Sequence, residues 1–79
     1  MKTDWHIVDK TAKDIAREVR RIRRAKKISQ ENLWLMSSVS LGSIKRFERT
    51  GNISLISLIK ILVSLDCLDQ FLPILKSGE

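Results

Sequence analysis

The 79-residue chain contains one cysteine, one proline and three glycines, and its four aromatic side chains include no tyrosine. The single thiol, Cys67, excludes an internal disulfide, and one histidine cannot complete a four-ligand zinc site with it. We expect Cys67 to act as a small buried hydrophobe. No apolar run approaches the roughly 18 residues of a membrane span, and the sequence shows no secretory signal. These absences predict a protein of the reducing cytoplasm with no membrane partner.

Residue patterns that support catalysis are also missing. The sequence has no nucleophile and base at a recognisable spacing, no glycine-rich phosphate loop and no cluster of metal ligands. We therefore expect a protein that is not an enzyme and that holds neither a metal nor a cofactor.

Acidic residues are few, since nine Asp and Glu stand against fifteen Lys and Arg, which gives a net charge of +6. Residues 1–50 hold thirteen basic and six acidic side chains, whereas residues 51–79 hold two and three. Because a chain this short forms a single domain, this division predicts one half that faces a polyanion and an apolar half that faces other protein. The alternative is an ordinary charged surface over a core.

Apolar residues at helical spacing begin after residue 11. Ile15, Val19 and Ile22 predict an amphipathic helix over residues 12–26, with Thr11 as its N-cap in a variant of the capping box. Residues 1–10 lack this pattern, and we expect a frayed arm there; a short strand that pairs with a partner is the alternative.

Two short helices follow. Ser29 is the expected N-cap of a helix over residues 30–37, and Ser40 that of a helix over residues 41–49. The side chains expected to face inward are Leu33, Met36, Ile44 and Phe47. About three residues connect the two helices, so the turn between them is tight.

The last third of the chain is strongly apolar. In a fourth predicted helix over residues 55–65, only Ser57, Lys60 and Ser64 are polar, and they form one narrow stripe. We expect this helix to be buried on nearly all sides. A final apolar segment follows, which Pro73 bends or ends.

The rest of so short a chain cannot cover this apolar surface. The sequence therefore predicts a homodimer through residues 55–75, with Phe71, Leu72 and Leu75 near the centre of the interface. The alternatives are that this tail docks a partner protein or folds back to complete the core of a monomer.

Two segments carry a resemblance to a known family. Residues 28–33 (ISQENL) and 39–48 (VSLGSIKRFE) together resemble the phage-repressor and Cro type of helix-turn-helix regulator. The resemblance implies an all-α fold, a five-helix lambda-repressor-like DNA-binding domain with a central helix-turn-helix. It divides the chain into an N-terminal arm (1–10), a DNA-binding domain (11–66) and a C-terminal helical tail (67–79) that forms the dimer contact.

The resemblance also implies roles for single residues. The positions that contact double-stranded DNA correspond to Gln30, Ser40, Leu41, Gly42, Ser43, Lys45, Arg46 and Arg49. Among them, Leu41, Gly42 and Arg46 face the bases, and Gln30 contacts a phosphate at the start of its helix. The remaining four lie beside the sugar–phosphate backbone.

Further positions either match or depart from the family pattern. Arg23 and Glu48 match a pair that ties the first helix to the third. Trp34 replaces the family's alanine where two helices cross, so it must swing outward or push them apart; we expect it in the core. Ser38 replaces the turn glycine, which predicts a left-handed backbone at modest cost, and Lys27 replaces the glycine after the first helix.

Taken together, these features predict a dimeric transcriptional regulator, a repressor, that binds double-stranded DNA sequence-specifically. The long apolar helix and the LDQFL ending resemble small antitoxins that bind kinase-like toxins and autoregulate their operons, which is the alternative. Binding of anionic membranes by the basic helix over 12–27 is weaker, as is RNA binding, because stacking aromatics are scarce.

Overall fold

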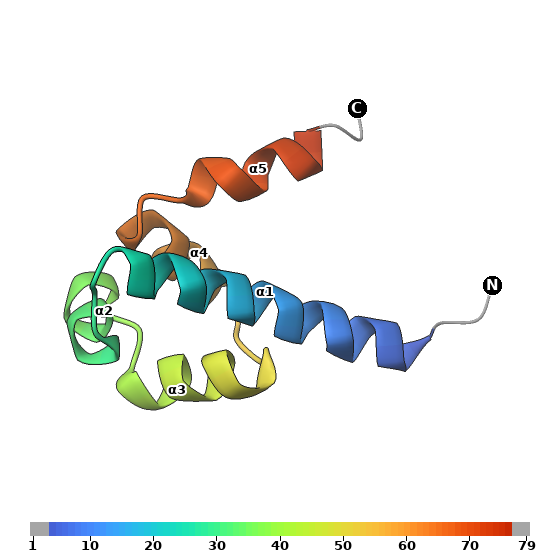
Figure 1. Cartoon of the computed structure of the whole chain (residues 1–79), viewed down its shortest axis with the longest axis horizontal. Helices are drawn as coiled ribbons and strands as arrows, with labels where there is room; N and C mark the ends of the chain where they lie inside the picture. The colour runs from blue at the N-terminus through green and yellow to red at the C-terminus, as the bar shows by residue number, and fades with distance from the viewer. Residues whose placement is uncertain (1–3, 77–79) are drawn as a thin grey trace.

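In the computed structural model, residues 4–76 are described, with side chains up to Leu72, and they form helices and turns without any strand (Figure 1). The five helices are α1 (Trp5–Ala25), α2 (Gln30–Ser37), α3 (Leu41–Thr50), α4 (Leu55–Ser64) and α5 (Leu68–Lys76). The expected all-α class and the five helices are therefore present. Within this described part, no helix is both long and apolar enough to cross a membrane.

Helix α1 is longer than its apolar pattern predicts. It begins at Trp5, where the Asp4 carboxylate accepts hydrogen bonds from the backbone N–H groups of His6 (2.9 Å) and Ile7 (3.4 Å). The expectation of a frayed arm is therefore wrong for residues 5–10, and Thr11 lies inside the helix instead of capping it. The early turns project beyond the other helices and bury no side chain, so they carry no amphipathic pattern (Figure 1).

The ends of α2 and α3 follow the sequence closely. The hydroxyl of Ser29 accepts from the N–H of Asn32 (3.0 Å), and that of Ser40 accepts from the N–H of Ser43 (3.1 Å). Residues 38–40 connect the helices, and Ser38 has a φ of 63°. The predicted N-caps, the tight turn and the left-handed serine are thus confirmed.

The outward side of α2 differs from expectation. Leu33 is fully buried, but Trp34 is 45% exposed and Met36 is 50% exposed. The indole of Trp34 therefore swings outward and does not push the two helices apart. The predictions that Trp34 and Met36 lie in the core are wrong. A short helix in a small domain can bury only one narrow side, and Leu33 and Ser37 occupy it here.

The core lies where α1, α2, α3 and α4 meet. Its buried apolar side chains are Ala16, Val19, Ile22, Leu33, Val39, Ile44, Phe47, Ile61, Leu62, Leu65 and Cys67. Burial raises the pKa of the Cys67 thiol, so this sulfur stays protonated and packs as the small hydrophobe expected.

Gly51 fixes the end of α3 against α1. It has a φ of 84°, and a Cβ at this position would stand 2.7 Å from the carbonyl carbon of Ala12. We expect Gly51→Ala to lower the free energy of unfolding by about 2 kcal/mol, because the left-handed backbone alone costs a non-glycine residue about 1–2 kcal/mol. Urea unfolding followed by circular dichroism measures the change.

Gly42→Ala is the matched control for that substitution. Gly42 lies inside α3, and no atom stands within 4 Å of where its Cβ would be. Alanine there is expected to raise the free energy of unfolding by about 0.5–1 kcal/mol, because glycine loses more backbone entropy in a helix. Equal losses in the two variants would contradict the close approach of Gly51 to α1.

Helix α4 is not buried on nearly all sides in the single chain. Leu55 is 71% exposed, Ile56 63% and Val63 58%, and with Ile59 they form what we call the α4 ridge. The buried side chains of α4 are instead Ile61 and Leu62, and the helix packs against α2 and α5. The expected polar stripe does not face solvent along its whole length, since Ser57 and Ser64 are half-buried whereas Lys60 is exposed.

An apolar groove of about 450 Å³ lies beside the α4 ridge. Its walls are Ile15, Leu55, Leu58, Ile59, Leu62, Leu68, Phe71 and Leu72. Figure 1 shows α5 extending away from α4. Pro73 lies within α5 and does not end it, and the side chain of Leu75, expected in the dimer interface, lies outside the described residues.

Candidate nucleic-acid interface

The outward side of α3 carries three cations beside a glycine. Gly42, Lys45, Arg46 and Arg49 recur at i, i+3, i+4 and i+7, and all four are exposed. We call these four residues the α3 face. Ile44 and Phe47 project from the opposite side and are fully buried, so the core sets the direction in which the α3 face points.

A buried charge network ties α3 to α1. The guanidinium of Arg23 donates to both carboxylate oxygens of Glu48, from Nε to Oε2 (2.7 Å) and from Nη2 to Oε1 (2.9 Å). Its Nη1 donates to the carbonyl of Ile28 (2.7 Å). Both charged side chains are more than nine-tenths buried, and the pair predicted from the sequence is confirmed. Bidentate geometry of this kind fixes orientation as well as distance.

Gln30 belongs to the same network. Its side-chain amide donates to Oε1 of Glu48 at 3.1 Å, so the first residue of α2 is linked to both α1 and α3. The sequence suggested only a phosphate contact for this residue. Gln30 is half-buried at the start of α2. One side chain therefore joins the network while it remains at the surface.

The other expected contact residues surround the start of α3. Ser40 is exposed, and its hydroxyl donates to that of Ser43 at 2.8 Å. Leu41 and Ser43 are half-buried, so each presents only part of its side chain. Because no atom lies within 4 Å of a Cβ at Gly42, the backbone there is open to close approach. The structure thus brings all eight expected residues to α3 and the adjoining start of α2.

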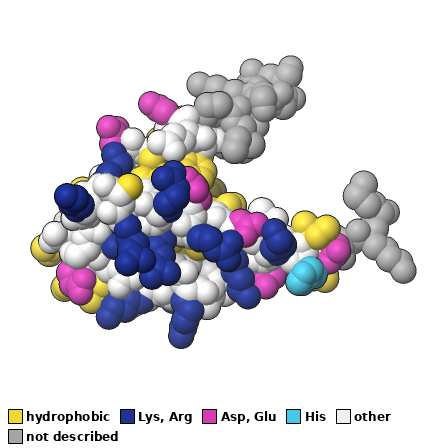
Figure 2. Space-filling view, in the orientation of Figure 1, with side chains coloured by type: hydrophobic (Ala, Val, Ile, Leu, Met, Phe, Trp, Pro, Cys, Tyr) yellow, Lys and Arg dark blue, Asp and Glu magenta, His cyan; other side chains and the backbone are white. Residues whose placement is uncertain are grey.

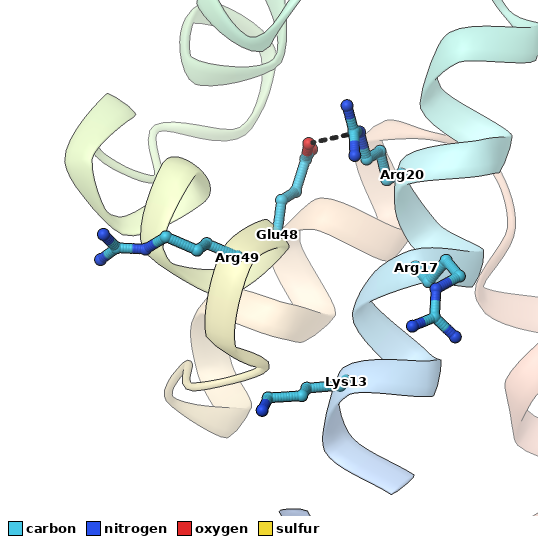
Figure 3. Close-up of a pocket in the computed structure, with 5 residues that line it drawn as sticks. All are labelled: Lys13, Arg17, Arg20, Glu48 and Arg49. Atoms are coloured by element: carbon cyan, nitrogen blue, oxygen red, sulfur yellow. Dashed lines mark ion pairs between the residues drawn. The ribbon is translucent and has the colours of Figure 1, made fainter. Parts of the chain in front are cut away.

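A basic groove of about 300 Å³ separates α1 from α3. Lys13, Arg17 and Arg20 line it from α1, and Glu48 and Arg49 line it from α3 (Figure 3). Arg20 points toward Glu48, with Nε 3.8 Å from Oε1, whereas Arg49 extends away from α1. Figure 2 shows that Lys and Arg side chains gather over α1 and α3 on this side of the molecule.

The α1 side of this groove was not among the residues expected at the site. Its signal in the sequence is the spacing of basic residues along one helical face, which begins at Lys10 and continues through Lys13, Arg17 and Arg20 to Arg24. From the sequence alone, that spacing is typical of a solvent-exposed helix surface. Only the structure shows that this surface lies beside α3.

Comparison of the chain with models of protein families, with curated proteins and with solved structures finds no match. The α3 face and its surroundings are therefore the features of this chain that bear on its function.

Proposed function

We propose that this chain is a sequence-specific regulator, a repressor, that binds double-stranded DNA through a helix-turn-helix made of α2 and α3. The α3 face is the observation that carries the proposal, because three exposed cations project from a short helix whose opposite side is fixed in the core. The second helix of such a motif lies in the major groove, which is about 12 Å wide. A lambda-repressor-like arrangement of the five helices is part of this proposal.

The residues of the site divide by the part of the DNA that they contact. Lys45 and Arg49 neutralise phosphates and supply affinity, whereas Arg46 reads a base edge, since guanidinium groups bind guanine in two-point fashion. Gly42 lets the helix backbone approach the bases, and Gln30 adds a phosphate contact. The Arg23–Glu48 pair positions α3 without touching DNA. Ser40 and Ser43 lie beside the backbone, and half-buried Leu41 meets the bases.

Selection from a random pool of duplex DNA tests the proposal. We expect the wild-type chain to enrich one motif, and Arg46→Ala to weaken binding by about 1–3 kcal/mol and to relax preference at one base position. Lys45→Ala is the matched variant, one residue away, and should weaken all sequences about equally. If Arg46→Ala left both affinity and preference unchanged, the assignment of α3 as the recognition helix would be wrong.

We propose further that two copies associate through residues 55–75. The α4 ridge stands beside the apolar groove, so the same surface offers a projection and a hollow that a two-fold axis can pair. Large exposed apolar patches usually mark interfaces. A dimer of this kind places two recognition helices about 34 Å apart, the spacing of one turn of DNA.

Analytical ultracentrifugation at micromolar concentration, without DNA, tests the dimer. We expect a dimer for the wild-type chain and a monomer for Val63→Glu, because the substitution places a charge on the α4 ridge. Lys60→Glu, on the same helix but outside the ridge, should remain dimeric. A 9.1 kDa wild-type monomer would refute the homodimer and would favour the antitoxin alternative, in which a toxin protein occupies the groove.

A further inference from the structure

A continuous row of cations runs along α1 beside the α3 face. Lys10, Lys13, Arg17, Arg20 and Arg24 alternate by three and four residues, so all five lie on one side of the helix, and all are exposed. We call them the α1 stripe. Asp14 lies on the same side of the helix between Lys10 and Arg17, and no acidic residue follows it along the stripe.

The α1 stripe places like charges next to one another on the helix surface. Lys13 and Arg17, like Arg20 and Arg24, are like charges four residues apart, and each such pair destabilises an isolated helix by about 0.2–0.5 kcal/mol. A polyanion bound along the stripe would remove this repulsion.

Acidic neighbours compensate mainly the first half of the stripe. The Asp9 and Asp14 carboxylates pair with Lys10, Lys13 and Arg17 at 2.9–3.1 Å. Arg20 has only a 3.8 Å approach to Glu48, a carboxylate that Arg23 already holds with two hydrogen bonds. The uncompensated charge therefore lies toward the second half of α1, beside α3.

The position of α1 relative to α3 gives the stripe a definite place on DNA. The two helices pack together and run in opposite directions, since Glu48 contacts Arg23 whereas Gly51 approaches Ala12 (Figure 1). Packed helices have axes about 8–10 Å apart, and the major groove is about 12 Å wide. With α3 in the groove, we therefore expect α1 to lie over the sugar–phosphate backbone that borders it. Lys13, Arg17 and Arg20 of the stripe line the basic groove beside α3.

The dimensions also agree. The fourteen-residue step from Lys10 to Arg24 spans about 21 Å at 1.5 Å per residue. One DNA strand carries a phosphate about every 3.4 Å of helix axis, so the stripe extends past roughly six phosphates. The ten residues of α3 span only about 15 Å.

We infer that the α1 stripe binds the phosphates of the strand that flanks the half-site read by α3, and that it lengthens the DNA segment the protein occupies. The inference rests on the proposed function, and it assigns α1 a phosphate-binding role in addition to its role as a support for α3. The stripe adds affinity and salt dependence but no base preference, because phosphate contacts carry no direct sequence information.

Two duplexes and two variants test the inference. One duplex contains only the selected motif, and the other extends it by ten base pairs of unrelated sequence on each side. The stripe variant is Arg17→Gln with Arg24→Gln, and the control variant is Lys26→Gln with Lys60→Gln, which loses the same net charge outside the stripe. Affinity is measured by fluorescence anisotropy over a series of salt concentrations.

We expect the wild-type chain and the control variant to bind the long duplex more tightly than the short one. The stripe variant should lose this gain, its logarithmic salt slope on the long duplex should fall by about two per protomer, and its selected motif should be unchanged. Equal affinities of the wild-type chain for both duplexes would overturn the inference and leave the proposed function intact. Failure to bind any duplex would overturn both.

Anionic vesicles provide the remaining comparison, because an exposed basic helix can also bind acidic lipid. Vesicles of phosphatidylcholine with phosphatidylserine are mixed with the wild-type chain and both variants in a flotation assay. If the stripe variant lost vesicle binding but kept the full affinity of the wild-type chain for the long duplex, the stripe would serve a membrane surface and the inference would be wrong.

Discussion

Replacing Glu48 by alanine is expected to lower the free energy of unfolding by about 3–5 kcal/mol, because it leaves the buried Arg23 guanidinium without its counter-ion. Arg23 is only 8% exposed. Of its described hydrogen-bond partners, the substitution leaves only the carbonyl of Ile28. The amide of Gln30 loses its acceptor as well. Since small domains are stable by about 5–15 kcal/mol, this single change removes a large fraction of the total.

Urea unfolding followed by circular dichroism at 222 nm measures the loss. The matched control is Glu18→Ala, which breaks the exposed pair between Glu18 and Arg21 on α1 and should leave the unfolding midpoint nearly unchanged. If the two alanine variants were equally stable, the Arg23–Glu48 pair would not stabilise the fold.

A double variant separates the loss of the pair from the cost of the orphaned charge. Arg23→Met with Glu48→Leu replaces both charged groups by apolar side chains, and buried pairs replaced in this way often leave stability unchanged or higher. We expect the double variant to be more stable than Glu48→Ala, even if Glu48→Ala alone does not fold. A double variant no more stable than Glu48→Ala would show that the network, including Gln30, is needed as a whole.

The features that the sequence predicted well are local ones. Ser29 and Ser40 are predictable as N-caps because a hydroxyl before an apolar periodic segment satisfies backbone N–H groups within three residues, and tertiary packing does not alter that geometry. The inward positions of Ile44 and Phe47 followed from helical spacing in the same way. The Arg23–Glu48 pair spans 25 residues, and only the family resemblance pointed to it.

The features that the sequence did not predict depend on what surrounds an element. The first turns of α1 bury nothing, so no apolar pattern marks them, and the Asp4 cap became visible only in the structure. The apolar character of Trp34 and of the α4 ridge predicts burial, but a small domain has too little chain to cover every apolar face. The α1 stripe indicates a binding surface only because α3 lies beside it, and the spacing of residues in the sequence does not show that arrangement.

The affinity of the chain for its selected DNA should fall by about 10²–10³-fold when salt is raised from 50 to 200 mM. Each protomer presents Lys45, Arg46 and Arg49 on the α3 face, so a dimer on a short duplex displaces counterions from about four to six phosphates. Each neutralised phosphate contributes about −0.9 to the slope of log affinity against log salt concentration, which gives a total near −4 to −5. Fluorescence anisotropy titrations at four or more salt concentrations measure this slope.

Single substitutions locate the source of the salt dependence. Lys45→Ala should make the slope shallower by about one per protomer, because it removes one phosphate contact. Lys60→Ala removes the same charge from α4, outside the α3 face, and should leave the slope unchanged. A wild-type affinity that stays constant across the salt series would mean that phosphates contribute little, and the assignment of the α3 face to DNA would then fail. A slope altered equally by both lysine substitutions would instead assign the salt dependence to net charge, without a defined contact surface on α3.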